Sequence, residues 1–313
     1  MVPCNRSTQR HAASSFRTQG SANRLSRILE RLRSKGWCAS LFNVCLVLAG
    51  CRLWLDPGPS VAFFYGHPVP FELFQQYEQV VVEADNLELD QIPATSKAQI
   101  FAYVSLGEAE RWRAGHEELP KHWFLGVNTS WNSDIADLTA PGWRHYILDQ
   151  RIATLWDQGY RGFFLDTLDS YRMALTDPAA QAAQQQALVN LIREIYQRFP
   201  GVQLLFNRGF ELLPEVGKLA EGIVAESLYY TWDAASKRYK EVDEKDRAWL
   251  LERLREANRR YGLPVTVIDY LPPDQRELAR EDAKRIVAMG FTPWVANPSL
   301  DVLGVGRADL EEE

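Results

Sequence analysis

Two acidic residues each close an apolar segment that is typical of a buried β-strand. Asp166 ends the segment GFFLD and Glu226 ends the segment GIVAE. An unbroken apolar run without alternation indicates a strand buried on both faces, as in a parallel sheet. A carboxylate at the carboxyl end of such a strand lies where barrel enzymes hold their catalytic groups. A pair of carboxylates suits glycoside hydrolysis, in which one group protonates the leaving oxygen while the other stays ionised.

Other polar and aromatic residues lie at or near the ends of the remaining predicted strands. In a barrel these side chains would share one end with the acidic pair, where polar groups bind sugar hydroxyls and aromatic rings stack on sugar faces. We predict as substrate-binding residues Tyr65, Glu83, Tyr103, Glu108, Asp169, Tyr171, Asn207, Tyr229, Asp269, Tyr270 and Trp294.

Several of these assignments have structural alternatives that the sequence leaves open. Asp166 could cap the following helix, and Glu226 could form a salt bridge with a neighbouring loop. Asp169 could orient a catalytic group or cap a helix. Glu83 could anchor a loop, and Asn207 could satisfy backbone groups instead of binding a hydroxyl.

The sequence shows no pattern for metal, cofactor or serine chemistry. The histidines lack metal-ligand spacing, and there is neither a GxSxG elbow nor a glycine loop that cradles phosphate. We therefore predict no metal and no cofactor. The five histidines are His11, His67, His116, His122 and His145.

Eight predicted strands, mostly followed by helical segments, favour a (β/α)8 TIM barrel over a doubly wound sheet, which rarely needs eight such units. The helical segments are Pro141–Gln158, Ala179–Phe199, Glu244–Tyr261 and Asp274–Met289. The strands are Val61–Tyr65, Val80–Glu83, Ile100–Leu106, Gly162–Asp166, Val202–Asn207, Ile223–Glu226, Val265–Asp269 and Thr292–Ala296.

Two details of this arrangement are more specific. The stretch Glu108–Leu138 is predicted to be an extended loop over the open end of the barrel, with aromatic residues that form a wall. In the helical segment Asp274–Met289 the spacing predicts an inward face of Leu278, Ala283, Ile286 and Val287.

The first fifty residues have the pattern of a secretory signal. A basic stretch is followed by a short apolar one and then by Leu48-Ala49-Gly50-Cys51, which resembles a bacterial lipobox with lipid on Cys51. We predict a signal region at 1–50, a tether at 51–60, the barrel at 61–303 and a tail at 304–313. The predicted location is exported and lipid-anchored, in the outer membrane or the periplasm.

The net charge of the chain changes sign at the same boundary, between residues 50 and 51. The whole chain carries −6 and residues 1–50 carry eight basic groups and one acidic group, or +7, so residues 51–313 carry −13. An acidic domain repels nucleic acid and attracts a cationic substrate. The other three cysteines, Cys4, Cys38 and Cys45, all precede Cys51, so the exported part would hold no disulfide.

Several long motifs occur in an order that resembles glycoside hydrolase family 114, the endo-α-1,4-polygalactosaminidases, including the hydrolase domains of Pel exopolysaccharide proteins. These motifs are VAFFYG, VVVEAD, AYVSLGE, WDQGYRGFFLD with TLDSY, and AESLYY, and the resemblance covers about residues 61–303. It implies a (β/α)8 barrel that cleaves α-1,4-linked galactosamine-rich polymer inside the chain. The acidic residues of the family motifs fall on Asp166 and Glu226, and the resemblance suggests retention of configuration.

The function expected from the sequence is therefore a secreted endo-glycosidase acting on a cationic galactosamine or N-acetylgalactosamine polysaccharide in a biofilm. One rival is a non-catalytic polysaccharide-binding barrel that assists exopolysaccharide export. A second is a glycosidase for an unrelated sugar. The expected partners are the polysaccharide, a membrane through the lipid anchor alone, and exopolysaccharide export machinery, with no nucleic acid.

Overall fold

The main sheet is an eight-stranded parallel barrel. In the computed structural model, which describes residues 58–304, the strands are hydrogen-bonded in their order along the chain. The last and first strands meet, and the backbone N–H of Tyr65 donates to the carbonyl of Leu300 at 2.7 Å near this seam. The strands are β1 (Val61–Phe64), β2 (Gln79–Val82), β3 (Gln99–Ser105), β7 (Gly162–Asp166), β8 (Gln203–Asn207), β9 (Gly222–Glu226), β12 (Val265–Tyr270) and β13 (Thr292–Ala296).

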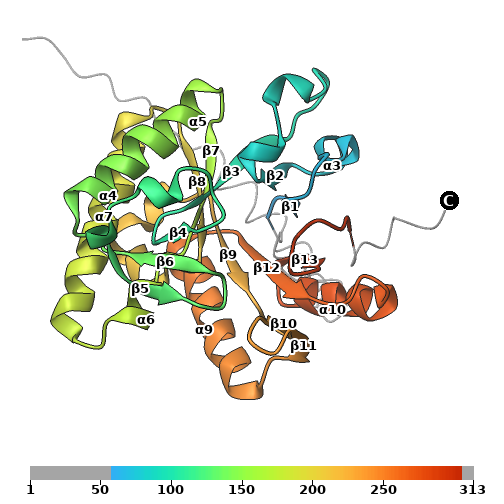
Figure 1. Cartoon of the computed structure of the whole chain (residues 1–313). Coiled ribbons are helices and arrows are strands. Elements are labelled where there is room, and N and C mark those ends of the chain that lie inside the picture. Colours follow the sequence, from blue (N-terminus) through green and yellow to red (C-terminus); the bar gives the residue numbers. More distant parts are fainter. Residues whose placement is uncertain (1–57, 305–313) are drawn as a thin grey trace, which may run out of the picture. The chain divides into compact units, whose positions relative to one another are not determined.

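Helices cover the outside of the barrel, with α4, α5 and α7 on one flank and α9 and α10 farther round (Figure 1). They are α3 (Phe71–Gln76), α4 (Pro141–His145), α5 (Ala153–Asp157), α6 (Tyr171–Ala174), α7 (Pro178–Arg198), α8 (Leu213–Val216), α9 (Glu244–Tyr261) and α10 (Arg276–Ala288). A π-helix, Tyr146–Ile152, joins α4 to α5, and the 3₁₀ turns are Ala84–Asn86, Leu89–Gln91, His116–Glu118, Lys121–Trp123, Phe210–Leu212 and Gly217–Leu219. The predicted (β/α)8 barrel is confirmed.

The barrel interior is filled by large side chains, as the apolar strand pattern requires. Phe63 of β1 and Phe164 of β7 meet edge to face at 5.3 Å between ring centroids, although their strands are not neighbours. Trp294 of β13 adds a third ring, 6.5 Å from Phe63. These contacts across the barrel axis form a packed layer beneath the residues that end the strands.

The stretch after β3 is folded more regularly than the predicted extended loop. It forms a three-stranded antiparallel sheet of β4 (Glu108–Glu110), β6 (Ser133–Ala136) and β5 (Phe124–Asn128), in that order. A second small sheet pairs β10 (Tyr230–Asp233) with β11 (Arg238–Glu241). The prediction of a loop was wrong because the short strands lack a clear apolar alternation and gain their burial from the barrel.

The predicted inward face of α10 was wrong in one residue. Val287 is 47% exposed, whereas Ala279, Asp282 and Ile286 are buried. The inward face is therefore rotated from the prediction, and it carries an acidic side chain into the core.

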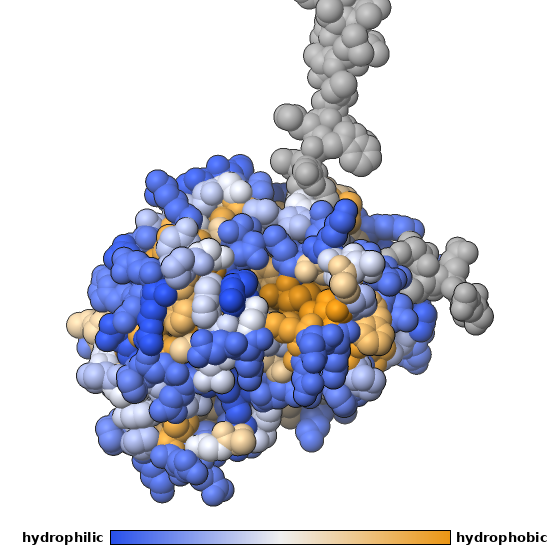
Figure 2. Space-filling model, turned by 90° about the horizontal axis from the view of Figure 1, so that it is seen from above, coloured by the Kyte–Doolittle hydropathy of each residue, from blue (hydrophilic) through white to orange (hydrophobic). Residues whose placement is uncertain are grey.

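The molecular surface is largely hydrophilic. Seen from above, it has a hollowed apolar area near the middle, surrounded by hydrophilic side chains (Figure 2). Within residues 58–304, no helix has the length and apolar character needed to cross a bilayer.

Candidate active site

The two predicted catalytic carboxylates lie together, joined by one amide. The Nδ2 of Asn207, at the end of β8, donates to Asp166 Oδ1 at 2.7 Å and to Glu226 Oε1 at 2.9 Å. The two oxygens are therefore at most 5.6 Å apart, the sum of the 2.7 Å and 2.9 Å bonds. Asn207 can bridge them because β8 lies between β7 and β9 in the sheet.

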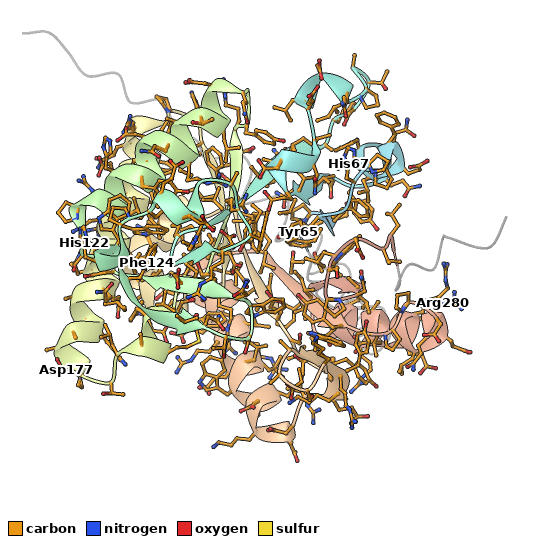
Figure 3. All side chains as sticks on the ribbon, viewed as in Figure 1. Tyr65, His67, His122, Phe124, Asp177 and Arg280 are labelled. Carbon is orange, nitrogen blue, oxygen red and sulfur yellow. The ribbon has the colours of Figure 1, made fainter. Side chains whose placement is uncertain are left out.

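Tyrosines from other strands donate to the outer oxygens of the pair. The hydroxyl of Tyr103 on β3 donates to Asp166 Oδ2 at 3.0 Å, and that of Tyr270 on β12 donates to Glu226 Oε2. Tyr65 packs on Tyr103 with ring centroids 5.3 Å apart. In Figure 3, Tyr65 lies near the centre of the molecule, whereas Asp177 and Arg280 lie at the edge of the molecule. Four of the predicted substrate-binding residues, counting Asn207, are thus brought to the acidic pair.

Burial shapes the electrostatics of this group. Burial, and then the charge of Glu226, raises the pKa of Asp166 to about 7, against hydrogen bonds from Asn207 and Tyr103 that favour the ionised form. Burial and the nearby carboxylates also raise the pKa of Tyr103 and Tyr270 well above the ordinary range. The tyrosine hydroxyls therefore stay protonated at neutral pH and act as donors.

The loop after β3 holds the residue that follows Asp166. Thr167 Oγ1 accepts from the backbone N–H of Gly107 at 2.8 Å and lies 2.8 Å from Ser105 Oγ. A Cβ at Gly107 would lie 2.2 Å from the Thr167 carbonyl oxygen, so only glycine fits there. The sequence motifs at residues 102–108 and 163–171 are thus two sides of one contact that fixes Asp166.

Glu83 is occupied by an internal cation. Both guanidinium nitrogens Nη1 and Nη2 of Arg113 bond its carboxylate at 3.0 Å, and Arg113 also bonds Asp85 at 3.1 Å and Glu110 at 3.2 Å. Glu83 and Arg113 are 7% and 8% exposed. Glu83 therefore anchors a loop, which was one of the alternatives left open by the sequence, because this ion cluster ties the end of β2 to the segment after β4.

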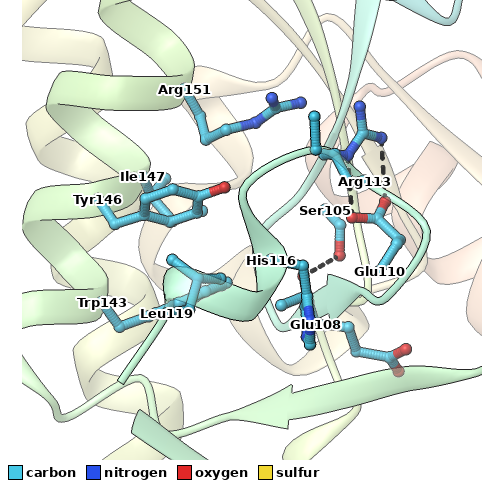
Figure 4. A pocket seen from close by; sticks show the side chains of 12 residues that line it. Ser105, Glu108, Glu110, Arg113, His116, Leu119, Trp143, Tyr146, Ile147 and Arg151 are labelled. Atoms are coloured by element: carbon cyan, nitrogen blue, oxygen red, sulfur yellow. Dashed lines mark hydrogen bonds and ion pairs between the residues drawn. The ribbon is translucent and has the colours of Figure 1, made fainter. Parts of the chain in front are cut away.

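Beside the ion cluster lies a polar cavity of about 10 Å³, lined by Arg113, Glu110, Ser105 and Tyr146 among others (Figure 4). A cavity of this size holds about one water molecule. It is too small for a sugar ring, so it is no substrate site.

Glu108 is also used inside the protein. It is 4% exposed and accepts hydrogen bonds from Asn128 at 3.1 Å, from Ser170 at 2.5 Å and from Ser133. These donors come from β5, β6 and the loop before α6. Glu108 therefore binds the small sheet to the barrel.

Asp269 is fully buried and accepts hydrogen bonds from three consecutive backbone N–H groups. Leu228 donates to Oδ1 at 2.6 Å, and Tyr229 and Tyr230 donate to Oδ2 at 2.7 Å and 3.0 Å. The ring of Tyr229 lies under the Arg285 guanidinium, 3.8 Å from its centre. Neither Asp269 nor Tyr229 is brought to the acidic pair.

Within residues 58–304, the remaining predicted binding residues form no side-chain hydrogen bond with the pair. Trp294 is 3% exposed in the layer beneath it, and Tyr171 is buried with the Arg172 guanidinium 5.8 Å from its ring centre. Asp169 is partly buried, one turn before Arg172, whose backbone N–H donates to its carbonyl at 3.0 Å.

Two buried ionisable residues, Arg113 and Asp282, were not predicted. Arg113 gives no sequence signal, because its partner Glu83 is 30 residues away. Asp282 was missed because an acid in a charged helix is normally solvated. Its spacing of three from Ala279 and four from Ile286 is the one available sign that it faces inward.

Within residues 58–304, no group of three histidine, cysteine, aspartate or glutamate side chains could hold a metal ion. The polar groups that converge at the end of the barrel are two carboxylates, one amide and two phenols. This set can hold one proton and one negative charge close together, which is the requirement of acid-assisted displacement at a sugar carbon.

Comparisons with known proteins agree with this chemistry. The family model of glycoside-hydrolase family GH114 matches residues 76–309. The glycoside hydrolase domain of PelA from Pseudomonas aeruginosa is 39% identical, with a TM-score of 0.71 over 80% of this chain and 99% of that domain. Ega3 of Aspergillus fumigatus, solved with galactosamine, shares the fold at 15% identity and a TM-score of 0.52, over 77% of this chain and 91% of that one.

A protein from Deinococcus radiodurans described only as uncharacterized is 27% identical over 249 residues, or 76% of each chain. The family match covers most of the chain, and the PelA domain is covered almost completely. The chain is a glycoside hydrolase and belongs to family GH114.

Proposed function

We propose that the chain is an endo-acting, retaining glycoside hydrolase of α-1,4-linked galactosamine-rich polysaccharide, with Asp166 and Glu226 as its catalytic pair. The observation that carries the proposal is the single Asn207 amide bonded to both carboxylates, at 2.7 Å and 2.9 Å. Retaining hydrolases hold their carboxyl groups about 5–5.5 Å apart, against about 6.5–9.5 Å for inverting ones. The upper limit of 5.6 Å between the bridged oxygens favours retention.

The protonation state supports the same mechanism. Because burial and the charge of Glu226 raise the pKa of Asp166 to about 7, the free pair holds one proton below that pH. One carboxyl group can then protonate the leaving oxygen while the other attacks the anomeric carbon and forms a glycosyl-enzyme ester. Water later attacks the anomeric carbon and displaces the enzyme carboxylate, and the first group takes the proton from that water.

Charge and family support the substrate class. Galactosamine is cationic when it is not acetylated, and residues 51–313 carry a net charge of −13. The sugar bound in the Ega3 structure is galactosamine. The motif resemblance implies cleavage inside the polymer rather than at its ends.

The first test measures release of soluble oligomers from purified α-1,4-galactosamine-rich polysaccharide. We expect release by the parent and by the matched controls Asp157→Asn and Glu221→Gln, which change exposed acids away from the pair. Asp166→Asn and Glu226→Gln should bind the polymer and release no more than about a thousandth as much, as expected when a catalytic group is lost. Full activity in either variant would refute the assignment of the pair.

The stereochemical test follows the anomeric signals of the first products by proton NMR. A retaining enzyme gives the α-anomer first, and the β-anomer then grows by mutarotation. A β-anomer as first product would refute the close-pair mechanism while leaving the hydrolase intact. A panel of neutral and acidic polysaccharides would show whether another sugar is the true substrate.

We also propose export with a lipid on Cys51, which lies outside the described residues. The support is the basic and apolar stretch that ends in Leu-Ala-Gly-Cys. Cells labelled with a fatty-acid probe should mark the parent chain and leave Cys51→Ser unlabelled, with Cys45→Ser as the control. Equal labelling of parent and Cys51→Ser would contradict the proposal.

A further inference from the structure

The turn that follows Glu226 is fixed by one buried carboxylate. The backbone N–H groups of Leu228, Tyr229 and Tyr230 all donate to Asp269, at 2.6 Å, 2.7 Å and 3.0 Å. The turn begins two residues after Glu226, so its position sets the direction in which the strand end carries that side chain. Burial raises the pKa of Asp269, and these three bonds act against that rise by favouring the ionised form.

The strand that carries Asp269, β12, also contacts Glu226 directly. Tyr270, the residue after Asp269 on β12, donates its hydroxyl to Glu226, and β12 pairs with β9 so that Ile268 lies opposite Glu226. Successive side chains on a strand point to opposite faces. Tyr270 therefore acts from inside the barrel, while Asp269 acts from the outer face, toward α10.

A second carboxyl group from α10 reaches Asp269 on that outer face. Asp282 is completely buried between Ala279 and Ile286 of the inward face, within hydrogen-bonding reach of Asp269. Within residues 58–304, no N–H or hydroxyl group donates to either of its carboxylate oxygens. At neutral pH these two adjacent buried carboxyl groups do not both ionise, because like charges this close repel strongly in a low-dielectric interior and Asp282 has no other donor to stabilise its charge.

We propose that Asp282 is protonated and donates a hydrogen bond to Asp269, and that this acid–carboxylate pair positions Glu226 through the turn 228–230. Both are positioning residues, since neither touches the acidic pair. We call the hydrogen bonds from Asp282 to Asp269 and from the turn 228–230 to Asp269 the clamp. The effect of the clamp on catalysis rests on the proposed function, whereas its effect on the turn does not.

The surrounding charges leave the proton on Asp282. Arg285, on the same helix, lies over the ring of Tyr229 at 3.8 Å, and Arg247 of α9 lies at 5.7 Å from that ring. Arg285 favours ionisation of Asp282, but burial and the charge of Asp269 outweigh it and raise the pKa of Asp282 to about 8. The clamp should therefore hold at neutral pH and loosen above about pH 8.

The activity test compares two replacements of Asp282. Asp282→Asn keeps a permanent donor of nearly the same shape, so we expect kcat within about twofold of the parent. Asp282→Leu removes the donor, and we expect kcat to fall about tenfold or more with KM nearly unchanged, because a small misplacement of a catalytic group is costly. Equal kcat in the Leu variant, measured well below its melting temperature, would overturn the positioning role.

The direct test measures hydrogen exchange of the Leu228, Tyr229 and Tyr230 amides between pH 6 and pH 10, corrected for the intrinsic rate at each pH. The parent should lose protection at these amides above about pH 8, and Asp282→Asn should keep it. Identical profiles would overturn the proposal even if the Leu variant does not fold. This readout needs no substrate, so failure of the proposed function would leave it interpretable.

Discussion

Replacing Asp166 with asparagine should stabilise the folded protein as the pH rises, while it abolishes hydrolysis. The pKa of Asp166 is raised from an ordinary 3.8 to about 7, mainly by burial and next by Glu226. The folded state therefore binds the proton more tightly than the unfolded chain, and ionisation costs stability. This cost is absent below about pH 4, grows between pH 4 and pH 7, and is complete above pH 7.

The magnitude follows from the size of the pKa change. At about 1.36 kcal/mol per pKa unit, a rise from 3.8 to about 7 corresponds to at most about 4 kcal/mol. Asp166 is partly exposed, and screening by solvent reduces the expected gain to about 2 kcal/mol. For a domain of this size such a gain raises the melting temperature by about 4–8 °C.

The assay is thermal unfolding of the parent, Asp166→Asn and the exposed control Asp157→Asn at intervals from pH 4 to pH 9. The difference in melting temperature between Asp166→Asn and the parent should be near zero at pH 4 and reach its full value by pH 8. The control should show no such trend. A difference that is independent of pH, or a less stable Asp166→Asn at pH 8, would refute the electrostatic account of the pair.

Three further changes test the supports of the site. Gly107→Ala places a Cβ 2.2 Å from the backbone oxygen of Thr167, so it should lower the free energy of unfolding by about 1–3 kcal/mol, measured with denaturant. An unchanged unfolding midpoint would contradict the close contact. Arg113→Met leaves the buried Glu83 and the partly buried Glu110 without their cation, so it should cost about 3–5 kcal/mol. Arg111→Met is the exposed control, and a similar loss of stability in both variants would contradict the role of the ion cluster. Tyr270→Phe removes a hydrogen bond to the Glu226 carboxyl group and should lower kcat roughly tenfold to a hundredfold. An unchanged kcat would mean that this bond does not act in the reaction.

The strands could be predicted from the sequence because their burial on both faces leaves a local mark. Each of the eight lies in an apolar run, and the parallel order follows from the helices between them. Asp166 and Glu226 could be proposed as partners for the same reason. A residue that ends a parallel strand must lie at the common end of the barrel, whatever its neighbours are.

The roles of the other acids could not be predicted in this way. Glu83 and Asp269 also follow apolar strands, so their sequence context resembles that of Asp166. Their partners are distant in the chain: Arg113 is 30 residues from Glu83, and Leu228 is 41 residues from Asp269. An acid that meets a buried cation or three backbone amides becomes part of the framework.

The sequence by itself therefore determined the barrel, its strands and the end at which the chemistry lies, because these depend on local apolar periodicity. The tertiary structure alone decided which carboxylates at that end have no cation or group of backbone amides as a partner. Asp166 and Glu226 share one amide from Asn207, and within residues 58–304 neither forms an ion pair with a cation, so burial and mutual repulsion can hold a proton on the pair. That outcome depends on distances across the barrel, which no local pattern encodes.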